Sequence, residues 1–182
     1  MSDAQTCGTR GDGEAAADRV TVIDVLLAID TATLLDKTDG HTPSATVDGS
    51  DCYRLSPGRD ALSGESGTGG ARWCIDVRPG QRLRIRWTPL AMRGEHAVLL
   101  QLALADETTL HHLRLHVEDK AVRYAPGTDT PTSPVAREAT DAFWQADVVA
   151  SGDAELTAEA IVTDREANVL GRFSWSFRMA VP

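Results

Sequence analysis

The sequence predicts an all-β fold, an antiparallel β-sandwich of the jelly-roll or immunoglobulin-like kind, and three observations support this prediction. Apolar and polar residues alternate with a period of two through many segments of strand length, and turn-forming residues separate these segments. No sustained helical pattern competes with the alternation. The length of 182 residues suits a single domain with one hydrophobic core.

The N-terminal part is expected to contain a tail, one buried strand and a long polar connection. Residues 1–19 mix Gly, Ala, Asp and Glu without a period, so they are interpreted as a flexible tail before a domain at residues 20–182. Residues 20–30 are apolar on both faces, which is typical of a covered strand, and residues 31–35 suit a short helical turn. Residues 36–70 contain seven glycines, which indicates a loop around one short strand at residues 52–55.

The middle of the chain predicts a hairpin followed by two further strands. Two alternating segments, residues 73–77 and 83–87, flank the turn at Pro79-Gly80, and each places a tryptophan on its apolar face. Alternation continues through residues 97–105 and 113–117. A turn is expected at Asp119-Lys120.

The C-terminal part predicts a long loop and then the last strands. Residues 125–140 contain three prolines, so we expect a loop that forms no central strand. Strands resume at residues 143–150 and 156–162. In the final strand the apolar residues share one face and are predicted to be buried: Val169, Phe173, Trp175, Phe177, Met179 and Val181.

The acidic composition excludes some classes of partner. The formal net charge of −9 opposes binding to nucleic acid or to an anionic membrane surface, so we expect neither partner. No apolar run is long enough to cross a bilayer, and no secretory signal is recognisable. We therefore expect a cytoplasmic protein whose Cys7, Cys52 and Cys74 stay reduced. The alternative is an exported protein in which Cys52 and Cys74 pair.

No pattern in the sequence indicates catalysis, so we predict no enzyme, no cofactor and no metal. The glycine-rich residues 64–70 lack the Lys-Ser/Thr ending of a phosphate-binding loop and are interpreted as a connector. His112 and His116 share a strand face but lie about 13 Å apart along an extended chain, too far for one metal ion. His111 points the other way in that strand. A solvated strand face is therefore favoured over a metal site.

Some residues are candidates for binding a ligand. Three arginines at alternate positions of residues 82–86 predict either an outer face paired with acids or a basic stripe for carboxylate or phosphate groups. An exposed ring beside such groups would suit a carbohydrate, and the rings considered are Tyr53, Tyr124 and Trp144. The candidate ligand-binding residues are Arg82, Arg84, Arg86, Tyr53 and Tyr124.

Three segments carry a resemblance to a known family through their residues and their order along the chain: Ile23 to Thr31 (IDVLLAIDT), Gly80 to Trp87 (GQRLRIRW) and Gly171 to Trp175 (GRFSW). Together they resemble the PixA/AidA inclusion-body protein family of bacteria over residues 20–181. The resemblance implies a compact β-sandwich, associated in some members with cytoplasmic inclusions and in others with adaptation to a host. It supplies no catalytic residues. Two departures are the low count of three methionines, which argues against sulfur storage, and Ser176-Phe177 where the family commonly has Asp-Pro.

These observations lead to two hypotheses about function. The first is a non-enzymatic, self-associating β-sandwich that forms a homo-oligomer at micromolar concentration. The second is a lectin-like module that binds a small molecule or a glycan through loops 36–70 and 125–140, because sandwiches place recognition loops at their ends.

Overall fold

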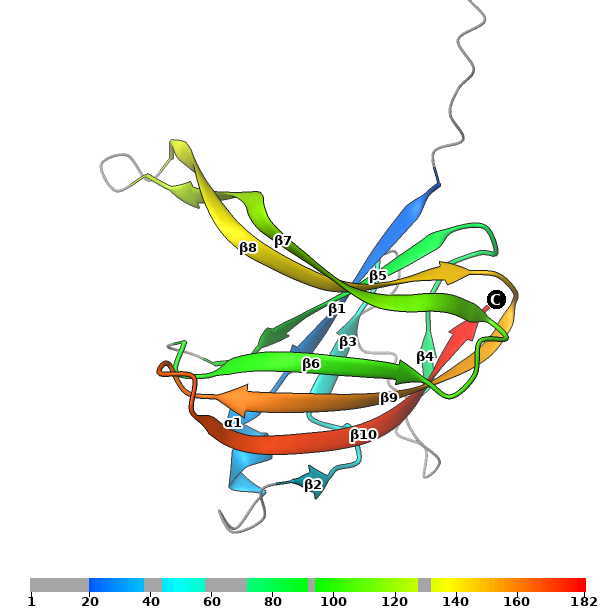
Figure 1. Cartoon of the computed structure of the whole chain (residues 1–182), viewed down its shortest axis with the longest axis horizontal. Helices are drawn as coiled ribbons and strands as arrows, with labels where there is room; N and C mark the ends of the chain where they lie inside the picture. Colours follow the sequence, from blue (N-terminus) through cyan, green and yellow to red (C-terminus); the bar gives the residue numbers. More distant parts are fainter. Residues whose placement is uncertain (1–19, 38–43, 58–71, 92–93, 128–131) are drawn as a thin grey trace, which may run out of the picture.

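The described residues form two facing β-sheets, called sheet A and sheet B, and one short helix (Figure 1). The computed structural model describes residues 20–37, 44–57, 72–91, 94–127 and 132–182. Sheet A has the order β3 (Cys52–Leu55), β1 (Val22–Ile29), β5 (Arg82–Pro89), β8 (Pro134–Val148) and β7 (Leu110–Pro126). Sheet B has the order β2 (Ala45–Thr46), β10 (Val169–Val181), β9 (Gly152–Thr163) and β6 (Ala97–Leu104), and β4 (Arg72–Cys74) also pairs with β10.

The all-β prediction is confirmed, but the sheets are mixed and not purely antiparallel. Strand β1 runs parallel to β5, and β2 and β4 run parallel to β10. Parallel neighbours need a long crossover between them. The chain supplies one, because the segment between β1 and β5 includes the helix, β3 and β4. Local alternation carries no information about strand direction, so the sequence could not have indicated this.

The predicted hairpin around Pro79-Gly80 is wrong. Strand β4 belongs to sheet B and β5 belongs to sheet A, so this turn carries the chain from one sheet to the other. The turn itself is present, since the Gln81 N–H donates to the Arg78 carbonyl over 3.0 Å and Gly80 has a φ of 87°. That conformation favours glycine.

The predicted helical turn is confirmed as α1 (Thr31–Asp36). It begins where it does because the Asp30 carboxylate accepts hydrogen bonds from the Thr33 N–H, over 3.1 Å, and from the Thr33 hydroxyl, over 2.9 Å. Among the described residues, no helix is long and apolar enough to cross a membrane.

The predicted turn at Asp119-Lys120 is wrong, and the loop predicted at residues 125–140 is wrong for residues 125–126 and 134–140, which are strand; residues 128–131 lie outside the described residues. Strand β7 runs continuously through 119–120 with a register shift between Glu118 and Ala121, and it pairs with β8 as far as Pro126 opposite Pro134. Both prolines lie at strand ends, where a missing N–H costs no ladder hydrogen bond. The ends of these two strands form a ribbon that projects from the sandwich (Figure 1). We call residues 119–126 with 134–140 the arm.

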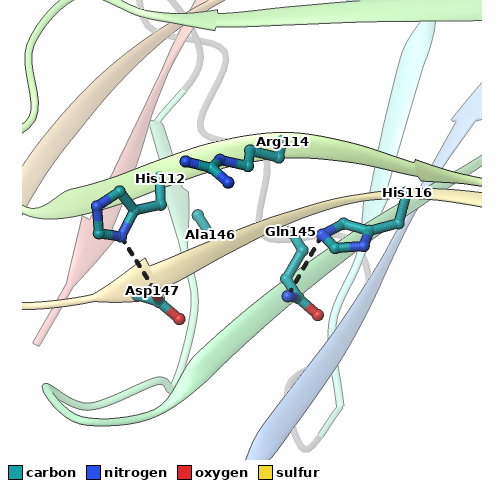
Figure 2. A pocket seen from close by; sticks show the side chains of 6 residues that line it. All are labelled: His112, Arg114, His116, Gln145, Ala146 and Asp147. Atoms are coloured by element: carbon teal, nitrogen blue, oxygen red, sulfur yellow. Dashed lines mark hydrogen bonds and ion pairs between the residues drawn. The ribbon is translucent and has the colours of Figure 1, made fainter.

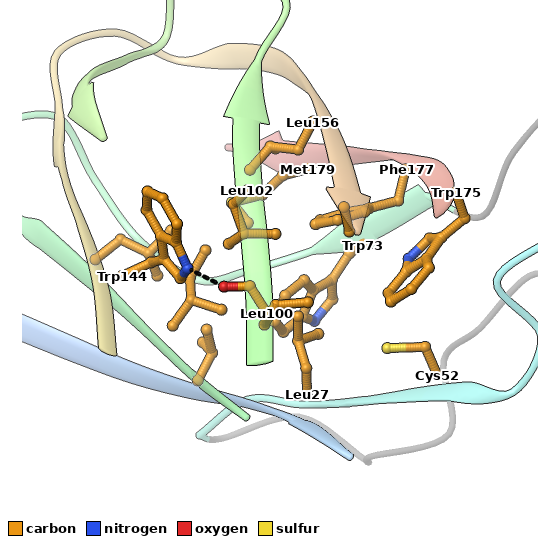
Figure 3. Close-up of a cluster of buried hydrophobic side chains, with 14 of the residues drawn as sticks. Leu27, Cys52, Trp73, Leu100, Leu102, Trp144, Leu156, Trp175, Phe177 and Met179 are labelled. Atoms are coloured by element: carbon orange, nitrogen blue, oxygen red, sulfur yellow. Dashed lines mark hydrogen bonds between the residues drawn. The ribbon is translucent and has the colours of Figure 1, made fainter. Parts of the chain in front are cut away.

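The core lies between the sheets and contains the predicted aromatic residues (Figure 3). Phe173, Trp175, Phe177, Met179 and Val181 are all buried, as the alternation of the last strand predicts, although Val169 is exposed. Trp73 is buried with them, and Trp87 is half-buried against the core.

Trp144, considered above as an exposed ring, is instead in the core. Its indole N–H donates over 2.9 Å to the Leu100 carbonyl on β6, in the opposite sheet. Trp87 does the same to the Val98 carbonyl over 2.8 Å. Two tryptophans of sheet A therefore satisfy carbonyls on β6, the edge strand of sheet B. The sequence gives no sign of this pairing, because the donor and acceptor come from different sheets.

Neither cysteine that the structure describes is paired. Cys52 is buried on β3 of sheet A and Cys74 is exposed on β4 of sheet B. Burial raises the pKa of the Cys52 thiol to about 12, which keeps it protonated and unreactive. The predicted tail at residues 1–19, Cys7 and the glycine-rich residues 64–70 lie outside the described residues.

Candidate functional site

The outer face of sheet A, which points away from sheet B, carries the predicted arginine ladder. Alternation on β5 places Leu83 and Ile85 in the core and the three arginines on the other side. Each arginine contacts an acid on a flanking strand. Arg82 lies 2.9 Å from Asp147, Arg84 lies 2.9 Å from Asp24, and Arg86 contacts both Asp24 and Asp141. The ladder is therefore an outer face paired with acids.

A buried aromatic ring lies beneath this ladder. Phe143 of β8 is only 4% exposed, although it is on the outer face and outside the core cluster. The guanidinium carbons of Arg84 and Arg86 lie 5.3 and 4.9 Å from its ring centroid. The His116 ring stacks on it at 5.3 Å with an interplanar angle of 7°. Cations and an imidazole thus cover the ring, and cation–π attraction holds them there.

Asp141 anchors the end of the ladder nearest the arm. It is 9% exposed and contacts both Arg86 and Arg123. Burial raises the pKa of the Asp141 carboxyl, but the hydrogen bond from Arg86 and the charges of Arg86 and Arg123 outweigh this effect, so the pKa is lower than usual. Asp141 is therefore ionised at neutral pH and ties the arm to the body of the sheet.

A pocket of about 290 Å³ lies on the same outer face and is lined by residues of β7 and β8 (Figure 2). Its lining consists of His112, Arg114, His116, Gln145, Ala146 and Asp147. His112 Nδ1 lies 3.3 Å from Asp147 Oδ2, and His116 Nε2 lies 3.5 Å from Gln145 Nε2. The hydrogen bond from Arg82 lowers the pKa of the Asp147 carboxyl. Burial opposes this effect, and the contact with His112 adds to it, so that the pKa is lower than usual.

A bulge in β7 shapes one end of this pocket. The register shifts between His111 and Arg114, and His112 has a φ of 56°. Such bulges bend the strand and redirect a side chain, and here the redirected ring reaches Asp147. The alternation of the sequence indicated that His112 and His116 share a face, but it did not indicate the bulge or the strand opposite. Within the described ranges, no cluster of three or more His, Cys, Asp or Glu residues suits a metal ion.

The five predicted ligand-binding residues do not converge on one place. Arg82, Arg84 and Arg86 form the ladder. Tyr53 lies opposite Ala28 on β3, two strands away from β5 at the edge of the sheet, and is 46% exposed. Tyr124 is on the arm and 75% exposed, and it follows Arg123, so it points to the opposite face. Ligand binding by these residues stays a prediction, and sequence reasoning missed Arg114, Gln145 and Phe143.

Comparison with known proteins establishes the family. The family model described as PixA inclusion body protein matches residues 21–181. The chain belongs to the PixA inclusion body protein family. A crystal structure of a PixA inclusion body protein from Burkholderia cenocepacia J2315 superposes with a TM-score of 0.64 at 16% identity, covering 92% of this chain and 99% of that one. This similarity shows a shared fold. A comparison with curated proteins finds no match.

Proposed function

We propose that this PixA-family chain is a non-enzymatic, self-associating protein of the cytoplasm, and that the arm is the surface through which two copies associate. The observation that carries the proposal is an apolar row on β7 that continues onto the arm, where no described residue of sheet B lies opposite it. The name inclusion body protein, given to the family and to the superposed crystal structure, is consistent with copies that pack together.

The apolar row on the arm continues the inner face of sheet A. On β7, Leu115 lies opposite the core residue Trp144, and Val117 lies opposite Ala142. Beyond the register shift between Glu118 and Ala121, Val122 and Tyr124 lie opposite Glu138 and Ala136. These two residues of β8 alternate in phase with Trp144, so Val122 and Tyr124 are on the same face as the core residues. The apolar face on β7 therefore extends past the core, and its outermost members are exposed: Leu115 42%, Val117 57%, Val122 56% and Tyr124 75%.

Two physical arguments indicate that this face needs a cover. A two-stranded ribbon is marginally stable in water alone, and a sheet with an apolar face is stable when a second layer packs on it. Strand β7 is also the edge of sheet A, so the N–H and C=O groups along its outer side are available to another chain. By contrast, two tryptophans cap carbonyls on the edge strand of sheet B.

A second copy of the chain is the occupant that fits best. Two arms related by a two-fold axis would place the same apolar row on each side and would rebuild the two-layer arrangement of the body. Further exposed apolar residues, Leu90, Val169 and Leu170, lie at strand ends. Val169 pairs with Thr163 and Thr163 with Ala97, at the end of sheet B nearest the arm (Figure 1). Leu90, Val169 and Leu170 would enlarge the contact between the two copies.

Sedimentation velocity of two matched variants tests the proposal. Val122→Glu places a charge on the apolar row, whereas Val135→Glu places the same charge on the other face of the same ribbon, where Val135 pairs with Ala125 and alternates in phase with Asp141. We expect the wild type and Val135→Glu to associate at micromolar concentration and Val122→Glu to be monomeric. Circular dichroism checks that both variants fold. A wild type that is monomeric throughout this range, or equal association of the two variants, would overturn the proposal.

A further inference from the structure

We infer that the pocket between β7 and β8 binds the phosphate group of a small molecule, with Arg114 as its main ligand-binding residue. This inference concerns the outer face of sheet A. It is independent of the proposed association, which uses the opposite face on the arm.

The arginines on this face differ in whether they form an ion pair. Arg82, Arg84, Arg86 and Arg123 each form an ion pair with an aspartate. In the part of the chain that the structure describes, no acid forms such a pair with Arg114. Its guanidinium group lines the pocket between the two histidines (Figure 2). A guanidinium group presents paired N–H donors that match the oxygens of phosphate.

The acid in the pocket, Asp147, already has cationic and polar partners. Asp147 is the one acidic residue among the described residues of the lining, and it already contacts Arg82 at 2.9 Å and His112 at 3.3 Å. Its negative charge is thus compensated by groups other than Arg114. An incoming anion would therefore find the unpaired guanidinium group of Arg114 next to a carboxylate that is ionised but already paired with Arg82. A metal cation would instead meet Arg114 in the centre of the site, which opposes its binding.

Further side chains that can donate hydrogen bonds line the pocket with Arg114. His112, Arg114 and His116 occupy alternate positions of β7, about 7 Å apart along the strand. The side-chain amide of Gln145, opposite Arg114 in the register, adds a donor from β8. These side chains line the same pocket as Arg114, so they surround the space that a phosphate group would occupy. The volume of about 290 Å³ is at the small end for ligand sites, which suits a small phosphorylated compound.

The same geometry argues against a sugar without phosphate. Carbohydrate sites use an exposed ring face, but Phe143, on which His116 of the lining stacks, is covered by Arg84, Arg86 and His116. Among the described residues, the lining of the pocket therefore consists mainly of charged and polar side chains and includes no Phe, Tyr or Trp ring. The net charge of −9 likewise opposes a nucleic-acid ligand.

Titration with inorganic phosphate, glucose 6-phosphate and sodium acetate at constant ionic strength tests the inference. The readout is the NMR signals of the His112 and His116 rings. We expect saturable shifts with both phosphate compounds and at least tenfold weaker binding in Arg114→Gln. The matched control is Arg178→Gln on β10 of sheet B, which should bind within twofold of wild type. His112→Gln, with an expected loss of severalfold, is a second variant should Arg114→Gln fail to fold.

Each result decides the inference. Tighter binding of glucose 6-phosphate supports a phosphorylated small molecule, and equal binding of the two phosphate compounds supports recognition of phosphate itself. Acetate binding as tight as phosphate would overturn the assignment to phosphate. Unchanged phosphate binding in Arg114→Gln, or no saturable shift in the wild type, would overturn the site.

Discussion

The body of sheet A and its arm present the same inner face in two different settings. In the body, sheet B covers this face, and Leu83, Ile85 and Trp144 are buried against it. On the arm the same alternation continues through Val122 and Tyr124, but no described residue of sheet B lies opposite them, and both are more than half exposed. The same apolar row is therefore buried as core in the body and left exposed on the arm, according to whether the fold supplies a second layer.

The largest expected difference between the two regions is in the stability of the monomer. Phe173→Ala removes a fully buried ring from the body and should lower the free energy of unfolding by about 3–5 kcal/mol. Tyr124→Ala removes an exposed ring from the arm and should change it by less than about 0.5 kcal/mol. Urea denaturation below the association range measures both values. Equal losses would mean that the arm is packed within the monomer.

The second prediction concerns the hydrogen bonds that tie sheet A to the edge of sheet B. Trp144→Phe leaves the Leu100 carbonyl without its donor in the core, so we expect a loss of about 1–3 kcal/mol. Trp87→Phe makes the same change at a half-buried position and should cost less, because water can reach the Val98 carbonyl more readily. Urea denaturation again measures the effect, and a larger loss in Trp87→Phe would contradict the account.

The third prediction concerns Asp141, at the junction of body and arm. Asp141→Asn removes the charge that Arg86 and Arg123 share, and we expect a loss of about 1–2 kcal/mol at pH 7. The pKa of Asp141 is lowered in the folded state. Its stabilisation is therefore present at neutral pH and is lost as the pH falls below about 4.

The pH series provides the check on this assignment. The difference in unfolding free energy between wild type and Asp141→Asn should shrink as the pH falls from 5 to 2.5, whereas Asp76→Asn, at an exposed position, should differ little from wild type throughout. A difference between wild type and Asp141→Asn that stays constant over this range would contradict the assignment.

The sequence predicted correctly which face of most strands is buried, but it did not predict which strands pair with each other. The alternation in β10 identified Phe173, Trp175, Phe177 and Met179 as buried, because a strand with one covered face has a strict period of two. The direction and partners of a strand depend on residues far away in the chain. This is why segments 73–77 and 83–87 resembled a hairpin although they belong to different sheets.

The arm was missed for a local reason. Prolines in residues 125–140 indicated a loop, but Pro126 and Pro134 lie at strand ends, where β7 and β8 pair with each other and with no other described strand. The candidate site was predictable in the same partial way. The arginine ladder and the shared face of His112 and His116 followed from alternation, whereas Asp147, Gln145 and Phe143 come from β8 and required the pairing of β7 with β8.

The central claim is that a second copy covers the arm, and hydrogen–deuterium exchange as a function of protein concentration tests it most directly. The account predicts that amides of residues 119–126 and 134–140 exchange rapidly in dilute protein and become protected as the concentration enters the micromolar range. Amides of the body strands β5 and β9 should be protected throughout. Arm amides whose exchange does not change with concentration while the protein associates would contradict the claim.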